Sequence, residues 1–478
     1  MNSLKLALVK LSKDVIEPLN LLDIAAYLKK KIPSIEIKII DRAYDNVIKE
    51  ILKFNPDIIG ISAMTVEYPL AIKLCKTIKE KMQVTVIIGG VHISFLPSSF
   101  NQCFDLGILG EGELPFYRVL DLFIKERKIN KDKLRDLDGV IFYEQNKLRI
   151  HPQKEIIQNL DEIPIKDRSL LNRKYFSKRP VYVLGKYKKG AFMITSRGCP
   201  YTCKFCISTR FFRKLRFDSA KKVVKEIKYL YHNYNIRYIH MWDDLFCCNI
   251  PRIKEIIKLL EQEGLLGKIT FFASIRGNLA TDEIFDLYKK LGVKSIGFGF
   301  ESGSDRILKY LKGNSVSVKQ NLDAIKKGVE KGFKMGTAFM IGIPTEKIRD
   351  MEKTRDVIKT CIDLGVSRLV FNILTPYPGC EIWEIAKRRG KVSENMDFSK
   401  LSFYDEIPLL LDKDVSIEEY LKIRKDILRL LNKLKYKCFI EYFLDDPIRT
   451  ILSSFLKPYS SLLKLLGLKN EKEEVNEI

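Results

Sequence analysis

The sequence has no uninterrupted apolar run as long as a membrane span, which needs roughly 18 residues. We also expect no signal peptide, because lysines interrupt the short apolar stretch 4–11. Ten cysteines spread over 478 residues, without a signal peptide, indicate a reducing compartment and argue against a disulfide framework. We therefore expect a cytoplasmic protein.

The charge is strongly unbalanced, with 84 Lys and Arg against 60 Asp and Glu and a net charge of +24. Such a surface attracts nucleic acids, anionic lipids or acidic substrates. The basic residues are scattered rather than blocked, so the charge by itself selects no partner. With 46% hydrophobic and 30% charged residues, the chain is typical of a globular protein long enough for two or three domains.

Three cysteines share one short segment, at Cys199, Cys203 and Cys206. A structural zinc site normally closes with four ligands in paired short spacings, and no second pair accompanies this segment. Thiolates are also the usual ligands of iron–sulfur clusters. Three thiolates on a four-iron cluster leave one iron open, which suits a catalytic cluster, because a substrate or cofactor must bind there.

The first 150 residues alternate apolar runs with amphipathic segments, which predicts a doubly wound, Rossmann-like parallel sheet. Polar and glycine residues follow three of the expected strands, at 62–65, 89–92 and 110–113. Ligands of open α/β sheets bind at the carboxyl ends of the strands. Ordinary strand-to-helix turns also favour Gly and Ser, so a plain turn remains the alternative. The expected strands are 4–11, 35–40, 57–64, 85–91 and 106–109.

A second series of strands and helices begins near residue 190, and the cysteine segment follows its first strand. We expect domains at 1–135 and 190–390, a connector at 136–189 with a short strand pair, and a helical region at 391–478. The expected strands of the second series are 191–195, 238–242, 270–275, 295–300, 336–341 and 368–374.

The C-terminal region is basic and apolar from residue 439 to 468, where Pro447 and Pro458 predict breaks between short helices. Such a stretch either lies on a membrane or packs as a helical cap on the preceding domain. The cap is the more common of the two arrangements. Peripheral membrane contact through this tail stays open.

The segment Thr195-Ser-Arg-Gly-Cys-Pro-Tyr-Thr-Cys-Lys-Phe-Cys206 resembles the CxxxCxxC signature of the radical S-adenosylmethionine (SAM) superfamily. Residues 17–28, 60–65, 89–97 and 110–113 resemble the cobalamin-binding domain of one large subgroup of that superfamily. The resemblance covers residues 1 to about 380. It implies a partial (β/α)6 barrel, a [4Fe–4S] cluster held by the three cysteines, SAM that is cleaved to a 5′-deoxyadenosyl radical, and cobalamin.

The resemblance also implies contacts to SAM at the carboxyl ends of the barrel strands. An acidic pair follows the second strand, an arginine the third, a Glu-Ser pair the fourth and a Gly-x-Pro-x-Glu turn the fifth. The SAM contacts implied in this way are Asp243, Asp244, Arg276, Glu301, Ser302 and Gly342. For the acidic pair, a solvated turn or a helix N-cap is the alternative.

The cobalamin contacts implied by the resemblance are Ser62, Thr65, Gly89, Gly90, Gly110 and Glu111. The Asp-x-His-x-x-Gly motif that supplies a histidine to cobalt in other cobalamin proteins is absent, as it often is in this subgroup. We therefore assign no ligand role to His92.

Three further cysteines, Cys247, Cys248 and Cys380, follow barrel strands where the family pattern has other residues. A thiol near a radical site can donate a hydrogen atom. Packing as a small hydrophobic residue is the default role for such cysteines. No other residue is assigned to catalysis.

The resemblance implies an enzyme that modifies an unactivated carbon, most simply by C-methylation of a hydrophobic or small-molecule substrate, with flavodoxin or ferredoxin as the reductant. The alternatives are an oxidative cyclase or C–C bond-forming enzyme acting on a lipid or tetrapyrrole, a tRNA methylthiotransferase, and a non-catalytic cobalamin or redox sensor. The second cluster motif of methylthiotransferases is missing, since only Cys75 and Cys103 occur in the N-terminal domain. We expect no nucleic-acid partner.

Overall fold

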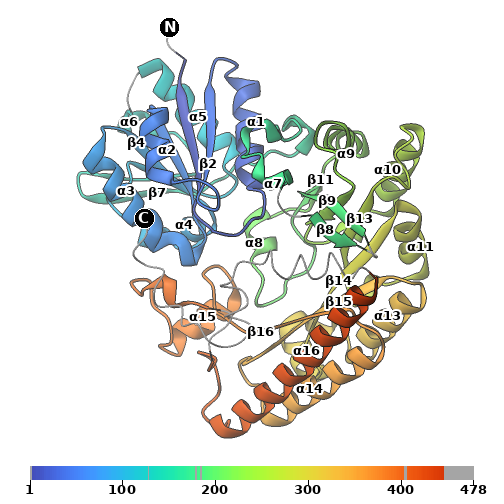
Figure 1. Ribbon diagram of the computed structural model, residues 1–478. Helices are drawn as coiled ribbons and strands as arrows, with labels where there is room; N and C mark the ends of the chain where they lie inside the picture. The colour runs from blue at the N-terminus through green and yellow to red at the C-terminus, as the bar shows by residue number, and fades with distance from the viewer. Residues whose placement is uncertain (1–2, 127–128, 178–179, 184–185, 403–405, 446–478) are drawn as a thin grey trace.

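A computed structural model describes residues 3–126, 129–177, 180–183, 186–402 and 406–445 (Figure 1). It contains two large sheets, each with helices packed against it. The α/β fold class and the helical C-terminal region predicted from the sequence are confirmed. The tail beyond residue 445, with the predicted breaks at Pro447 and Pro458, lies outside the described residues.

The first sheet has seven strands in the order β2-β1-β3-β4-β5-β6-β7. Its first five strands are parallel, and β6 and β7 join its edge as an antiparallel pair. The strand pair expected within the connector thus extends the first sheet. The strands are β1 (Lys5–Lys10), β2 (Glu36–Asp41), β3 (Ile58–Ser62), β4 (Thr85–Gly89), β5 (Leu106–Ile108), β6 (Val140–Glu144) and β7 (Lys147–His151).

Helices cover both faces of this sheet, which is why its parallel strands are continuous runs of Ile, Leu and Val. Helices α1 (Leu19–Lys31) and α5 (Glu113–Glu126) contribute to the core on one face, and α2 (Val47–Phe54) and α3 (Tyr68–Lys81) to the core on the other. The short helix α4 (Val91–Phe95) follows β4 at the carboxyl edge of the sheet.

The second sheet has the order β16-β15-β14-β13-β12-β9-β8, and the six strands from β16 to β9 are parallel (Figure 1). This is the arrangement of a partial (β/α)6 barrel. The strands are β8 (Pro180–Val183), β9 (Lys186–Met193), β12 (Tyr238–Met241), β13 (Thr270–Ile275), β14 (Val293–Glu301), β15 (Lys334–Ile341) and β16 (Arg368–Ile373).

Four of the helices that alternate with these strands begin at a polar residue that caps them. Ser219, Asn249, Thr281 and Ser317 each accept a hydrogen bond from the backbone N–H three residues further along. Such caps satisfy backbone donors that a helix start leaves unpaired. The helices are α9 (Ala220–Tyr234), α10 (Ile250–Gln262), α11 (Asp282–Leu291), α12 (Asp305–Lys312), α13 (Val318–Glu330), α14 (Ile348–Asp363) and α15 (Glu381–Arg388).

The chain's last described helix, α16 (Ile417–Asp445), lies along α14 (Figure 1). It buries Tyr420, Ile423 and Ile427 in the barrel core. This part of the C-terminal region is therefore a helical cap. No helix in the described part of the chain is long and apolar enough to cross a membrane.

The two sheets meet through the loops at their carboxyl edges. Phe95, at the end of α4, packs against Phe211, which follows the cysteine loop, with ring centroids 6.0 Å apart. A side chain at Gly379, which follows β16, would overlap the Phe95 ring at 2.3 Å. Arg210 donates to the Gly379 carbonyl at 2.7 Å. The ligand-binding edge of the first sheet therefore faces the open end of the barrel.

Candidate active site

A cavity of about 450 Å³ opens at the carboxyl edge of the second sheet. Its wall includes all three cysteines of the CxxxCxxC segment and residues from β12, β13, β14, β15 and β16. Active sites of parallel βα barrels lie at this edge of the strands. The cavity is therefore the candidate active site.

The cysteine loop begins at a sharp turn. Gly198 has φ +90°, and a Cβ there would lie 2.9 Å from the Lys214 carbonyl oxygen, so only glycine fits. Within the loop, the Cys206 N–H donates to the Cys203 carbonyl at 3.1 Å, and the Ser208 N–H donates to the Cys206 thiol sulfur at 3.5 Å. Burial raises the pKa of Cys199 and brings that of Cys206 to about 11. Ligation by a metal favours the thiolate over the thiol.

The loop fits a cluster better than a single metal ion. Among the residues that the structure describes, no three His, Cys, Asp or Glu side chains converge on one metal position. A cubane does not require such convergence, because each thiolate binds a different iron. Cys199, Cys203 and Cys206 would hold the cluster with their thiolates toward the cavity.

Arg276 lies directly beside this loop at the end of β13. Its guanidinium donates to the Cys203 sulfur at 3.5 Å and to the Ser315 hydroxyl at 2.6 Å, and it stacks over the Tyr201 ring at 4.0 Å. A cation in this position offsets the negative charge of a thiolate-bound cluster. It also lines the cavity where an anionic end of SAM would sit.

The two adjacent aspartates after β12 have different surroundings. Asp244 lines the cavity and accepts a hydrogen bond from the Ser208 hydroxyl, and burial raises its pKa. Asp243 is 3% exposed and accepts from the Thr195 N–H at 3.0 Å and its hydroxyl at 2.9 Å. Asp243 therefore braces the strand before the cysteine loop, and Asp244 is the one that faces the cavity.

The other predicted SAM residues divide in a similar way. Glu301 lines the cavity and pairs with Lys312 at 3.0 Å. Ser302 is fully buried behind it, and its hydroxyl lies 3.2 Å from the Thr354 hydroxyl. Gly342 has φ +80° in the turn after β15, where its N–H donates to Glu346 at 2.8 Å. Of these three residues, Glu301 lines the cavity, whereas Ser302 and Gly342 lie outside its wall.

None of the three additional cysteines lines the cavity. Cys247 is 3% exposed in the barrel core, where burial raises its pKa to about 12. Cys248 packs partly against the same core. Cys380 is 1% exposed, and its thiol donates to the Tyr377 carbonyl at 3.1 Å. These positions match packing and not hydrogen-atom donation.

The loops predicted to bind cobalamin lie at the carboxyl edge of the first sheet, as expected. Gly90 has φ +109°, and a Cβ there would lie 2.4 Å from the Ala63 carbonyl oxygen. Gly110 has φ +76°, and its Cβ would lie 2.2 Å from Gln153 Oε1. Ser62 accepts from the Asn20 side chain at 3.0 Å. Two adjoining loops thus need glycine. Without side chains at these positions, the backbone is accessible at this edge, which fits the close approach of a large planar cofactor.

The remaining cobalamin predictions differ among themselves. Gly89 ends β4 with no close contact at its Cβ position, and Thr65 is buried at the start of a short 3₁₀ helix, 65–67. Glu111 is 6% exposed, and its carboxylate binds Arg197 at 2.5 Å and also Arg216. Its side chain therefore joins the domains, and its backbone N–H and carbonyl are hydrogen-bonded to the Gln153 side chain. The His92 ring packs on Tyr68, and its Nε2 is hydrogen-bonded to the Ser99 hydroxyl at 3.0 Å.

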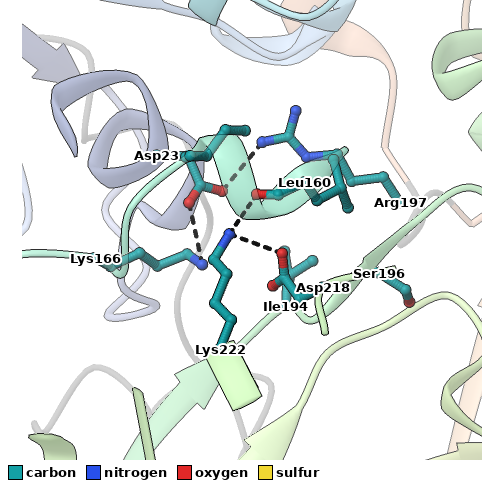
Figure 2. A pocket seen from close by; sticks show the side chains of 9 residues that line it. Asp23, Leu160, Lys166, Ile194, Ser196, Arg197, Asp218 and Lys222 are labelled. Atoms are coloured by element: carbon teal, nitrogen blue, oxygen red, sulfur yellow. Dashed lines mark hydrogen bonds and ion pairs between the residues drawn. The ribbon is translucent and has the colours of Figure 1, made fainter. Parts of the chain in front are cut away.

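The sequence reading missed a buried network of charged residues between the domains. Arg197 binds Asp23 at 3.3 Å, Asp23 binds Lys166 at 3.1 Å, and nearby Lys222 binds Asp218 at 2.8 Å (Figure 2). Arg168 extends the network, with ion pairs to Glu17 at 2.6 Å and Glu226 at 2.8 Å. The available signals were an arginine two residues before Cys199 and, in the distant segment 110–113, two glutamates that flank a glycine.

Comparison with known proteins agrees with both halves of this description. The family model for the radical SAM superfamily matches residues 193–358, and that for the B12-binding domain matches residues 6–120. The uncharacterized methyltransferase PH0819 of Pyrococcus horikoshii is 32% identical over 86% of this chain and 84% of its own. The cytidylyl-2-hydroxyethylphosphonate methyltransferase of Streptomyces wedmorensis is 25% identical over 80% of this chain and 77% of its own.

Among solved structures, the cobalamin-dependent SAM radical enzyme OxsB, with aqua-cobalamin and SAM bound, has the same fold. Its TM-score is 0.68 at 18% identity, over 96% of this chain and 75% of that one. The chain belongs to the radical SAM enzymes with an N-terminal B12-binding domain, and its cofactors are a [4Fe–4S] cluster, SAM and cobalamin.

Proposed function

We propose that the chain is a C-methyltransferase that acts on an unactivated carbon of a small or hydrophobic substrate. Both relatives described above are methyltransferases by name. The observation that carries the proposal is the single cavity of about 450 Å³ onto which the cysteine loop opens, at an edge that faces the cobalamin loops. When bound, the cluster and SAM supply the radical that removes a hydrogen atom, and cobalamin carries the methyl group.

The residues around the cavity have separate proposed tasks. Asp244 and Glu301 present carboxylates to the polar groups of SAM, and Lys312 fixes the Glu301 side chain at 3.0 Å. Arg276 supplies positive charge beside Cys203. Gly297, Gly299 and Ala338 leave space on β14 and β15 for a substrate next to SAM.

Reaction products made from SAM with a deuterated methyl group test the proposal. The reduced enzyme, loaded with cluster and cobalamin, is incubated anaerobically with lipid and metabolite extracts of its source. We expect 5′-deoxyadenosine and one product that carries the deuterated methyl group in place of hydrogen. A product that has lost two hydrogens and gained no label would identify an oxidative cyclase. Absence of 5′-deoxyadenosine with every extract would identify a sensor.

Radical SAM enzymes need an electron donor. We propose flavodoxin or ferredoxin in this role, since the net charge of +24 favours an acidic protein partner. Electron delivery should slow at high salt, because screening weakens such encounters. Two results together would refute this partner. SAM would be cleaved as fast with a small chemical reductant as with flavodoxin or ferredoxin, and the rate with flavodoxin or ferredoxin would not depend on salt.

The end of α16 is the part of the described chain that we propose for peripheral membrane contact. Tyr436, Ile440 and Leu444 are exposed there, next to Lys433 and Lys437. Apolar and basic side chains on one helix favour an anionic lipid surface. Co-sedimentation with phosphatidylglycerol vesicles, reduced in the Tyr436→Ser/Ile440→Ser variant, would support the contact. Equal sedimentation of both proteins would exclude it.

A further inference from the structure

The cavity contains a cation that the SAM and cluster assignments do not use. Arg368, at the start of β16, lines the cavity and is exposed. Within the described part of the chain, its guanidinium has no hydrogen bond or ion pair. A guanidinium offers five N–H donors in a fork that matches a carboxylate or a phosphate.

The carboxylates in the cavity wall are already engaged by other groups. Among the described lining residues these carboxylates are Asp244, which accepts from Ser208, and Glu301, which pairs with Lys312 at 3.0 Å. Neither forms an ion pair with Arg368. The guanidinium of Arg368 is therefore free to bind an anionic group that enters the cavity.

The space beside Arg368 is kept open by glycines. Gly336 on β15 is paired in register with Arg368, and Gly297 on β14 is paired with Gly336. A Cβ at Gly336 would meet nothing closer than the Arg368 Cβ at 3.5 Å, so packing alone does not require glycine there. The missing side chain adds volume to the cavity in front of the guanidinium.

Rings of residues on or just after β12 and β13 also line the cavity: His240, Trp242 and Phe272. Phe192 packs against them, with ring centroids 3.9 Å apart for His240–Phe272 and 5.0 Å for Phe192–Trp242. Burial and the nearby Arg368 lower the pKa of His240 to about 4, so the imidazole is neutral at physiological pH. Of the described cations that line the cavity, Arg276 and Lys312 have protein partners, and Arg368 shares the wall with these rings.

We propose that Arg368 binds a carboxylate or phosphate group of the substrate while the apolar or ring-shaped part of the substrate lies against Trp242 and Phe272. This inference rests on the proposed function, because it assigns the substrate class of the same cavity. The substrate is thereby assigned to the class of organic oxyanions and not to the neutral hydrocarbons. The reacting carbon then lies between this anchor and the cysteine loop.

Binding of phenyl phosphate, benzoate and phenol to the enzyme loaded with cluster, cobalamin and SAM tests the inference. The three probes share a ring, and only two carry an oxyanion. Dissociation constants come from equilibrium dialysis, and tryptophan fluorescence locates the probe, since the chain has two tryptophans and Trp383 is 1% exposed whereas Trp242 is 42% exposed. We expect one or both anions to bind and to change the Trp242 emission, and phenol to bind more weakly. Phenyl phosphate and benzoate separate a phosphate site from a carboxylate site.

The Arg368→Met variant should weaken anion binding at least about tenfold, or about 1.4 kcal/mol, without changing phenol binding. Arg368→Lys should restore part of the affinity. Arg355→Met is the matched control, because it removes the same charge from an exposed pair with Asp356 on α14. Gly336→Leu is a second test of the anion site. It should also weaken anion binding, because the leucine side chain fills the space beside Arg368 while the arginine itself is retained.

Two results would overturn the inference. One is equal anion affinity in wild type, Arg368→Met and Gly336→Leu. The other is a loss of SAM affinity in Arg368→Met as large as the loss of anion affinity, which would assign the guanidinium to the SAM carboxylate. The probes bind without turnover, so a failure of methyl transfer would count against the proposed function and leave this measurement unaffected.

Discussion

Arg197, two residues before the first cysteine of the cluster loop, donates to Glu113 of the N-terminal domain at 2.5 Å. The same guanidinium binds Glu111 at 2.5 Å, and both carboxylates are almost fully buried. The residues that fix the start of the cluster loop are therefore supplied by the domain that binds cobalamin. Through this contact, the fold fixes the position of the cluster loop relative to the cobalamin-binding domain.

Arg197→Met should destabilise the protein by about 3–5 kcal/mol, because it leaves the buried Glu113 carboxylate without its ion-pair partner. It should also weaken cobalamin binding, since the pair fixes the loop of Glu111. Urea unfolding and cobalamin titration measure the two effects. Arg118→Met is the control, because that arginine forms a more exposed pair with Glu155 and should cost about 1 kcal/mol or less. Equal losses in the two variants would contradict the coupling role.

Gly90→Ala should reduce cobalamin affinity and cost about 1–3 kcal/mol of stability, because its φ of +109° and its 2.4 Å approach to the Ala63 carbonyl exclude a side chain. The neighbouring Gly89→Ala is a matched control, since its nearest contact would be 3.8 Å away. Thermal unfolding and the absorption spectrum of bound cobalamin report the outcome. Similar behaviour of the two variants would show that the tight turn at Gly90 does not shape the loop.

Asp244→Asn should raise the dissociation constant for SAM about tenfold or more, because a carboxylate that faces the cavity loses its charge. Asp243→Asn should instead lower the unfolding temperature, since Asp243 holds Thr195 and faces no cavity. Isothermal titration with SAM and thermal unfolding separate the two. The reverse pattern would exchange their roles.

Glu346 is a buried carboxyl group, 1% exposed, and burial raises its pKa to about 8. The folded state therefore holds this proton between about pH 4.5 and 8, where the unfolded state releases it, and stability falls as the pH rises through this range. Glu346→Gln should remove this loss and gain on the order of 1–3 kcal/mol at pH 9, with little change at pH 5. Chemical unfolding at the two pH values measures it. A variant that is less stable than wild type at pH 9 would show that Glu346 is ionised in the fold.

The sequence predicted the strands and the cluster loop well, since both depend on local pattern. Continuous apolar runs such as 84–88 can only be strands covered on both faces, and three cysteines in eight residues must share a loop. The different surroundings of Asp243 and Asp244 could not be predicted, because adjacent residues in a loop point in different directions that only the fold decides. Glu111 was predicted to contact cobalamin, yet its carboxylate partner is Arg197, 86 residues away in another domain.

The residues that line the barrel interior were likewise not predictable from local sequence pattern. Gly297 and Gly336 look like ordinary small residues within strands, and Arg368 looks like a solvated strand end. Only the register of β14, β15 and β16 places them side by side in the cavity wall. Long-range pairing thus brings together three residues of the cavity wall that local pattern leaves apart.

The most direct test of the central claim is the metal content and electron paramagnetic resonance spectrum of the anaerobically purified, reduced enzyme before and after SAM is added. We predict about four iron and four sulfide ions per chain, a spectrum that changes on SAM binding, and loss of both features in Cys203→Ala with retention in Cys248→Ala. One zinc ion per chain, or a cluster whose spectrum is unaffected by SAM, would contradict a cluster with an open iron at Cys199, Cys203 and Cys206.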